Sequence, residues 1–117
     1  MRHQRGNKKL GRPTDQRIAL LRSLSRALIL NPSIVTTDTK SKELVRYLER
    51  VVTLGKDGSL AARRQALRLI PDKKVISVVF TNIAKRYEKR AGGYIKTIKV
   101  GFRKGDAAPL TKLSWVE

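Results

Sequence analysis

The side chains of this sequence that can do chemistry are almost all cations. The chain has 117 residues, and its 27 Lys and Arg face nine Asp and Glu, so the formal net charge is +18. Lysine meets a phosphate group as a point charge, while arginine meets it as a planar fork and also stacks on unpaired bases. A polyanion is therefore the expected partner, and nucleic acid is the polyanion that this charge favours.

The strongest candidates are cations that cluster without acidic neighbours, together with one histidine and one tyrosine that could stack on bases. The predicted RNA-binding residues are Arg2, His3, Arg5, Lys8, Lys9, Arg12, Arg17, Arg22, Arg26, Arg63, Arg64, Arg68, Lys85, Arg86, Tyr94, Lys96, Arg103 and Lys104. Some of them have an equally good structural explanation. Tyr94 follows a Gly-Gly turn, where a tyrosine stacks on a base or packs at a strand edge. Lys85 and Arg86 also suit the dipole at a helix C-terminus.

Catalysis and metal binding lack the residues that they need. There is no cysteine, and His3 is the one histidine, so a zinc site has too few ligands. No P-loop, dinucleotide-binding glycine motif or Ser-His-Asp set is present. Asp38, Glu43 and Glu49 come nearest to a carboxylate group for a two-metal nuclease. We therefore expect no enzyme, metal, cofactor or small-molecule substrate.

The same charge and size suit a DNA-compacting protein, which is the rival interpretation. Such a protein would show a dimer interface or an intercalating apolar residue, and neither can be picked out of this sequence. No apolar run is long enough to span a bilayer, and the first residues lack the apolar stretch of a secretory signal. We expect a cytoplasmic protein with no membrane partner.

These residues must be positioned by a small fold that follows a basic segment. Residues 1–12 carry five cations and no acid, with one large apolar residue after Met1, so they have nothing to bury and are predicted to be an extended arm. The remainder, residues 13–117, is predicted to be a single α+β RNA-binding domain.

Apolar residues at helical spacing predict four helices, at residues 14–30, from Asp38 to a C-cap at Gly55, at 60–70 and at 73–90. The predicted inward residues include Leu60 and Phe80. In the first helix, Arg22 and Arg26 are expected to point away from the apolar stripe. In the second, Arg46 and Arg50 repeat this spacing, but acidic neighbours make a solvated face at least as good an explanation as RNA contact.

Three strands are expected, at residues 33–37, 94–102 and 110–116. Alternation in the second strand places Tyr94, Lys96, Ile98, Val100 and Phe102 on one face. Trp115 is expected in the core. The last two strands should form an antiparallel hairpin that the first strand joins. The predicted fold class is α+β, with four helices packed on a small antiparallel or mixed sheet and a basic extended N-terminal arm.

Several short blocks occur along the whole chain in one order. They include Lys9-Leu10-Gly11-Arg12, Ile34-Val35-Thr36-Thr37, Thr53-Leu54-Gly55-Lys56, Arg63-Arg64-Gln65-Ala66-Leu67, Gly92-Gly93-Tyr94 and Arg103-Lys104-Gly105-Asp106-Ala107-Ala108-Pro109. In order and spacing they resemble the family of the bacterial-type large ribosomal subunit protein numbered seventeen. The resemblance implies a structural constituent that binds large-subunit rRNA near the exit-tunnel side, beside neighbouring ribosomal proteins, and supports subunit assembly and translation.

Overall fold

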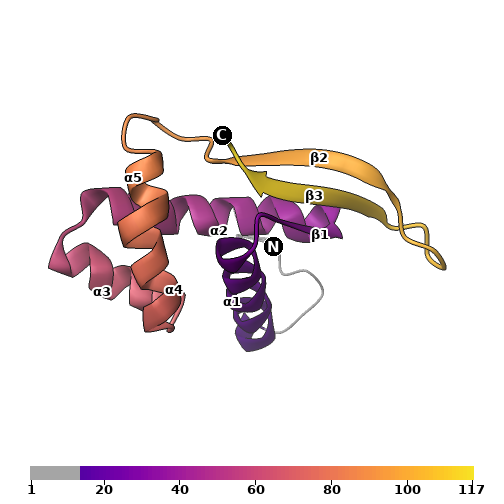
Figure 1. The fold of residues 1–117 in the computed structure, drawn as a ribbon. Coiled ribbons are helices and arrows are strands. Elements are labelled where there is room, and N and C mark those ends of the chain that lie inside the picture. Colours follow the sequence, from indigo (N-terminus) through magenta and orange to yellow (C-terminus); the bar gives the residue numbers. More distant parts are fainter. Residues whose placement is uncertain (1–13) are drawn as a thin grey trace, which may run out of the picture.

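The computed structural model describes residues 14–117, and the predicted arm at residues 1–12 lies outside them. The described elements are α1 (Thr14–Leu30), β1 (Ser33–Thr37), α2 (Asp38–Asp57), α3 (Leu60–Leu69), α4 (Lys73–Val78), the π-helical turn η1 (Val79–Ile83), α5 (Ala84–Arg86), β2 (Ile95–Phe102) and β3 (Pro109–Trp115). Because α4, η1 and α5 form one continuous helix, the described chain has four helices and a three-stranded antiparallel sheet, as predicted (Figure 1).

Short polar side chains begin two of the helices. The Ser59 hydroxyl accepts a hydrogen bond from the backbone N–H of Ala62 at the start of α3. The Asp72 carboxylate accepts from the N–H groups of Lys74 and Val75 at the start of α4. Each acceptor pairs with N–H groups that have no partner within the helix. The predicted helix starts near Ser59 and Asp72 are therefore confirmed.

Gly55 does not end the second helix, contrary to the sequence prediction. Helix α2 continues to Asp57 and is closed by Gly58, whose φ is 73°. Gly55 is buried where α2 meets η1, and a Cβ there would lie 3.1 Å from the Ala84 Cβ and 3.2 Å from a methyl group of Val79. The glycine is needed for close helix packing rather than for a left-handed cap.

The last predicted helix is shorter and less regular than its sequence pattern indicates. It ends at Arg86 instead of residue 90 and contains the π-turn Val79–Ile83. A π-turn shifts the helical register of the residues that follow it. Val79, Ile83 and Tyr87 are buried, whereas Phe80 is half-buried and packs against the edge of the core. The prediction that Phe80 is a core residue is thus only partly met.

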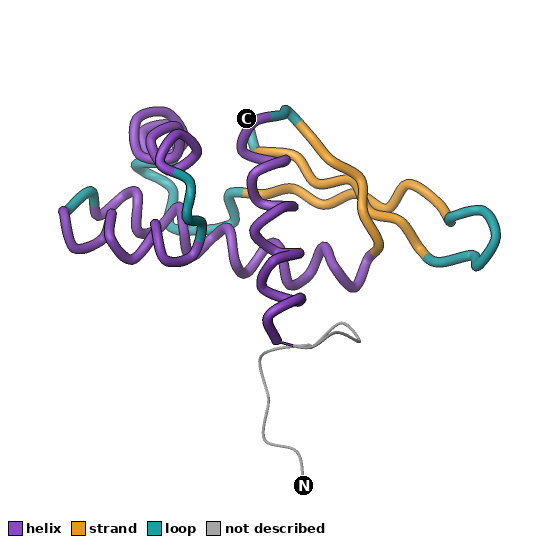
Figure 2. Tube along the Cα trace, turned by 90° about the horizontal axis from the view of Figure 1, so that it is seen from below, coloured by secondary structure: helices purple, strands orange, loops and turns teal. Residues whose placement is uncertain are grey.

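The sheet has the strand order β1-β3-β2, so the last strand in the chain is the central one. A β-bulge between Lys99 and Gly101 interrupts β2 and brings Phe102 opposite Pro109. The predicted single face from Tyr94 to Phe102 is therefore wrong, because one extra residue in a bulge reverses the alternation beyond it. Figure 2 shows the β2–β3 hairpin reaching away from the helices, with its loop at the far end.

Helix α2 packs against one face of this sheet. The Thr111 hydroxyl on β3 donates to Asp38 Oδ1 over 3.1 Å. The Tyr94 backbone N–H donates to Glu49 Oε2 over 3.2 Å. The Asp38 contact lies near the beginning of α2 and the Glu49 contact in its second half. The helix is therefore attached along much of its length, and the other sheet face is left for Lys96, Ile98 and Lys112.

The buried core joins all layers of the fold. Its large, fully buried side chains include Leu28 of α1, Leu44 and Leu48 of α2, Ile76 of α4 and Leu113 of β3. Trp115 is half-buried beside this core, and its indole Nε1 donates to the backbone oxygen of Leu28 over 2.9 Å.

Leu60, predicted to point inward, is 66% exposed. Helix α3 buries the face that carries Ala62 and Ala66. Leu60 lies two positions before Ala62 and six before Ala66, and at about 3.6 residues per turn this spacing turns its side chain away from the buried face. The small alanines bring α3 close to its neighbours, while Leu60 remains at the surface.

Candidate nucleic-acid interface

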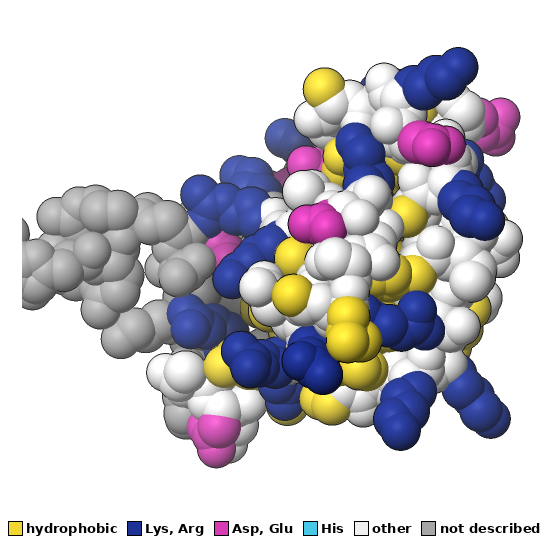
Figure 3. Space-filling view, turned by 90° about the vertical axis from the view of Figure 1, so that its left-hand side faces the viewer, with side chains coloured by type: hydrophobic (Ala, Val, Ile, Leu, Met, Phe, Trp, Pro, Cys, Tyr) yellow, Lys and Arg dark blue, Asp and Glu magenta, His cyan; other side chains and the backbone are white. Residues whose placement is uncertain are grey.

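The largest group of predicted RNA-binding cations in the described chain lies on α3 and the end of the α4–α5 helix. Arg64, Arg68, Lys85 and Arg86 are exposed. Arg63 is half-buried, and its guanidinium carbon lies 5.2 Å from the centre of the Phe80 ring. Figure 3 looks onto the side of the molecule where these helices lie, and basic side chains outnumber acidic ones on it. These helices therefore present a cationic surface interspersed with apolar side chains.

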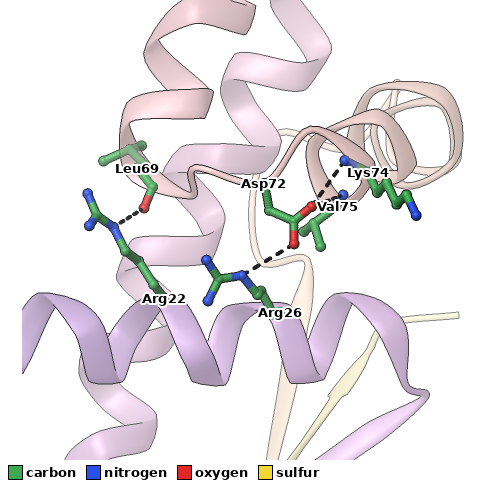
Figure 4. A network of polar contacts seen from close by, with 6 residues as sticks. All are labelled: Arg22, Arg26, Leu69, Asp72, Lys74 and Val75. Carbon is green, nitrogen blue, oxygen red and sulfur yellow. Dashed lines mark hydrogen bonds and ion pairs between the residues drawn. The ribbon is translucent and has the colours of Figure 1, made fainter.

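Two residues predicted to bind RNA also make contacts between helices. Arg22 donates from Nε to the Leu69 oxygen over 3.1 Å and from Nη2 to the Arg68 oxygen over 2.9 Å. Arg26 lies 3.4 Å from the Asp72 carboxylate, which also caps α4 (Figure 4). The last carbonyls of a helix lack intrahelical partners and attract cations. Both arginines thus contact neighbouring helices, and the RNA contact predicted for them stays a prediction.

A second cationic region lies between α1 and α2. Arg17, Arg46 and Arg50 line a hollow of about 430 Å³ together with Tyr47. Arg46 lies 3.5 Å from Glu43, so part of its charge is compensated. Burial raises the pKa of the Tyr47 hydroxyl, which donates to the Leu69 oxygen. The sequence left two explanations for Arg46 and Arg50, RNA contact and a solvated face. Their position beside the same hollow as Arg17 results from the packing of α1 against α2, which the sequence alone does not show.

Tyr94 packs inside the fold. Its side chain is 2% exposed, and its ring lies 5.4 Å from that of Tyr87, centre to centre. Lys56 Nζ donates to the Tyr94 hydroxyl over 2.9 Å and to the Arg90 backbone oxygen. Of the two alternatives for this residue, its burial favours packing, because a side chain that is 2% exposed offers little ring surface to a base.

The hairpin loop contains a tight ion pair. Arg103 Nε and Nη2 donate to the two carboxylate oxygens of Asp106 over 3.1 and 2.6 Å. These bonds, with the Ala108 backbone N–H, hold the pKa of Asp106 at about 2, and they raise the pKa of Arg103. The fork of Arg103 is thus engaged inside the loop, and Lys104 is the exposed cation next to it.

Residues 14–117 contain neither a candidate metal cluster nor a helix that could span a membrane. Within that range no three His, Cys, Asp or Glu side chains gather in a way that could hold a metal ion. None of the helices described there is long and apolar enough to cross a membrane.

Comparison with known sequences decides the family. Residues 20–116 match the family model described as ribosomal protein L17. The chain belongs to the ribosomal protein L17 family. This finding confirms the resemblance drawn from the short sequence blocks, and the L17 family is one of ribosomal structural proteins rather than enzymes.

Individual L17 relatives agree with this assignment. The large ribosomal subunit protein bL17 of Syntrophus aciditrophicus is 43% identical over 99% of this chain and 93% of its own length. That of Trichlorobacter lovleyi is 47% identical over the whole chain and 94% of its own length. That of Geotalea daltonii is 49% identical over the whole chain, which spans 65% of the relative. This chain therefore covers some L17 proteins almost completely and about two thirds of others.

In this L17-family chain, the predicted set divides into three groups. Arg2, His3, Arg5, Lys8, Lys9 and Arg12 lie outside the described residues. Arg22, Arg26, Tyr94 and Arg103 make the internal contacts given above. The others are found on exposed or half-buried surface, namely Arg17, Arg63, Arg64, Arg68, Lys85, Arg86, Lys96 and Lys104.

Lys112 on β3 was not predicted, although it is exposed directly opposite Ile98. A signal for it was present, because Trp115 was expected in the core. Since side chains alternate along a strand, that pattern turns Lys112 and Ser114 outward.

Proposed function

We propose that this L17-family chain binds and stabilises large-subunit rRNA through phosphate contacts and base stacking, as a structural constituent of the large ribosomal subunit in the cytoplasm. In this role it supports subunit assembly and translation. Its partners are the rRNA and neighbouring ribosomal proteins near the exit-tunnel side. The bL17 relatives are large-subunit proteins by name, which supports the placement in that subunit.

The observation that carries the proposal is how the acidic residues are used. Asp38, Glu43, Asp72 and Asp106 all lie within 4 Å of a basic side chain of the same chain. Four of the nine acids are thus paired with a cation of the same chain, while cations such as Arg64 and Arg68 are left at the surface. A surface with this much uncompensated charge repels itself unless a polyanion covers it. rRNA supplies that charge in the form of regularly spaced phosphates.

Salt dependence of binding tests the α3 surface directly. The double variant Arg64→Gln/Arg68→Gln removes two exposed charges from one helix. Each phosphate contact contributes about 0.9 to the slope of log K against log salt for a duplex, so binding to a large-subunit rRNA fragment should lose roughly 1.8 units of slope. The charge-matched control Lys40→Gln/Lys42→Gln alters α2, where the proposal places no contact, and should keep the wild-type slope. An α3 variant with the wild-type slope would exclude this surface.

The arm is tested in the same assay. Replacing Arg2, Arg5, Lys8, Lys9 and Arg12 by glutamine keeps the chain length and removes five charges. If the arm lies on phosphates, the slope falls by up to about 4.5. An unchanged slope would show that these residues do not contact phosphate.

Sedimentation tests the cellular role. The chain should remain with the large subunit on a sucrose gradient after a high-salt wash, because many shared phosphate contacts and packing against rRNA resist salt better than surface adsorption. A chain that runs free, or travels with DNA, would contradict the proposal and favour the DNA-compacting alternative.

A further inference from the structure

A broad groove lies beside the open face of the sheet, away from the cationic residues of α3. It has a volume of about 1130 Å³ and is lined by the end of α1, by η1 and α5, and by residues of β2 and β3. Its lining includes the cations Arg86, Lys96 and Lys112. Among the described residues that line it, Glu117 is the single acid. The groove is therefore cationic.

The sheet face that enters this groove alternates between apolar and basic side chains. Val35, Lys112 and Ile98 lie directly opposite one another across the three strands. In the neighbouring row, Ser114 of β3 lies opposite Lys96 of β2. Val35 is 56% and Ile98 45% exposed. Since α2 packs on the opposite face, no helix within residues 14–117 covers this surface, and its apolar side chains are placed between cations.

Trp115 lines the same groove in a fixed position. Its indole N–H is bonded to the Leu28 oxygen, and its ring stacks on Tyr87 with centres 6.3 Å apart and planes 28° from parallel. These two contacts hold the accessible part of the Trp115 ring rigidly in the wall of the groove. An aromatic ring that is already held in place can stack on a base without losing side-chain conformational entropy on binding.

We propose that this groove and the adjoining sheet face bind an unpaired RNA strand. Its bases lie against Ile98 and Trp115, and its phosphates meet Arg86, Lys96 and Lys112. Unpaired RNA presents bases and phosphates together, so it covers the apolar residues and neutralises the cations. A duplex presents mainly phosphates and leaves the apolar residues exposed. The inference rests on the proposed rRNA-binding function and specifies the form of RNA that this site takes.

The sole tryptophan of the chain makes the site observable. Titrating the full chain with a short oligouridine should quench Trp115 fluorescence, whereas an RNA duplex of equal length should not. In Lys96→Gln/Lys112→Gln, the slope of log K against log salt for the oligouridine should fall by about 1.4, since a single strand contributes about 0.7 for each phosphate contact. The matched control Lys40→Gln/Lys42→Gln removes the same charge from α2, on the other side of the sheet, and should keep the wild-type slope.

The outcomes separate this proposal from the broader one. Equal quenching by the duplex, or a wild-type slope in Lys96→Gln/Lys112→Gln, overturns the groove site. If the wild-type chain still binds rRNA with a steep salt dependence, the proposed function survives that result. Quenching by an acidic peptide but not by oligouridine would also overturn the site, because the groove would then receive protein. Loss of binding to every RNA would defeat both proposals. Both double variants must first show the wild-type urea midpoint, so that a folding defect is not mistaken for lost binding.

Discussion

Arg22 offers a sharp test of the structure, because its sequence pattern predicts RNA contact and its position predicts a role in stability. In Arg22→Met the apolar stem is kept while the donors to the Leu69 and Arg68 oxygens are lost. A hydrogen bond from a charged group contributes about 1.5–3 kcal/mol. The Tyr47 hydroxyl still donates to the Leu69 oxygen, and the Arg68 oxygen lies at an exposed position that water can reach, so neither acceptor would be buried without a partner. The expected loss is therefore that of about one such bond, roughly 1.5–3 kcal/mol.

The assay for Arg22 is equilibrium unfolding in urea followed by circular dichroism. Arg22→Met should lower the midpoint without changing the m-value, while the control Arg64→Met, which alters an exposed cation on α3, should stay within about 0.5 kcal/mol of the wild type. RNA binding should show the reverse pattern, with a lower salt slope for Arg64→Met alone. The reasoning is refuted if Arg22→Met has wild-type stability and loses about 0.9 of slope.

Three further outcomes follow from the packing and the ion pairs. Gly55→Ala gains about 1 kcal/mol of helix propensity but places a Cβ 3.1 Å from the Ala84 Cβ, and such overpacking costs about 1–3 kcal/mol. Urea unfolding should therefore show a lower free energy of unfolding, and a stabilised variant would contradict the close approach. Phe80→Ala should cost roughly 2 kcal/mol in the same assay, below the 3–5 of a fully buried phenylalanine, and a larger loss would show that Phe80 is core. The Asp106 carboxylate should titrate by NMR near pH 2, because Arg103 hydrogen-bonds it, and its pKa should rise towards the ordinary value of about 3.9 in Arg103→Gln, where the Ala108 N–H bond remains. As its folded pKa is lowered, its contribution to stability is present above about pH 4 and is lost as the pH falls towards 2.

Local sequence signals predicted most of the fold. Thr14 and Leu30 bound the first helix as expected, and the strand Ser33–Thr37 has the predicted limits. These elements are defined by caps, breakers and β-branched residues that act within a few positions. The predictions that failed depend on distant residues. A glycine such as Gly55 suits a helix end and a close contact equally well, and only Ala84 and Val79, more than twenty positions away, decide between them.

The candidate site was harder to predict than the fold. A cation on an outward helix face looks the same in the sequence whether it meets RNA or the end of another helix. Arg22 was predicted to bind RNA because it has no acidic neighbours in the sequence, and nothing near it in the chain marks the carbonyls of residues 68 and 69 as its acceptors. Likewise, the bulge at Lys99 to Gly101 leaves the alternating pattern of β2 intact in the sequence while reversing its faces in space. Composition predicted a polyanionic partner, but the assignment of each cation required tertiary contacts.

The strand order β1-β3-β2 also sets the time at which the protein completes its fold. The central strand β3 is the last described element, and its contact between Thr111 and Asp38 joins residues 73 positions apart. Closing so long a loop is entropically costly and slows folding. During synthesis, β1 and β2 emerge with no sheet partner, and their backbone edges stay open until β3 arrives. The helices can assemble early, but the sheet forms only when residues 109–115 have left the ribosome.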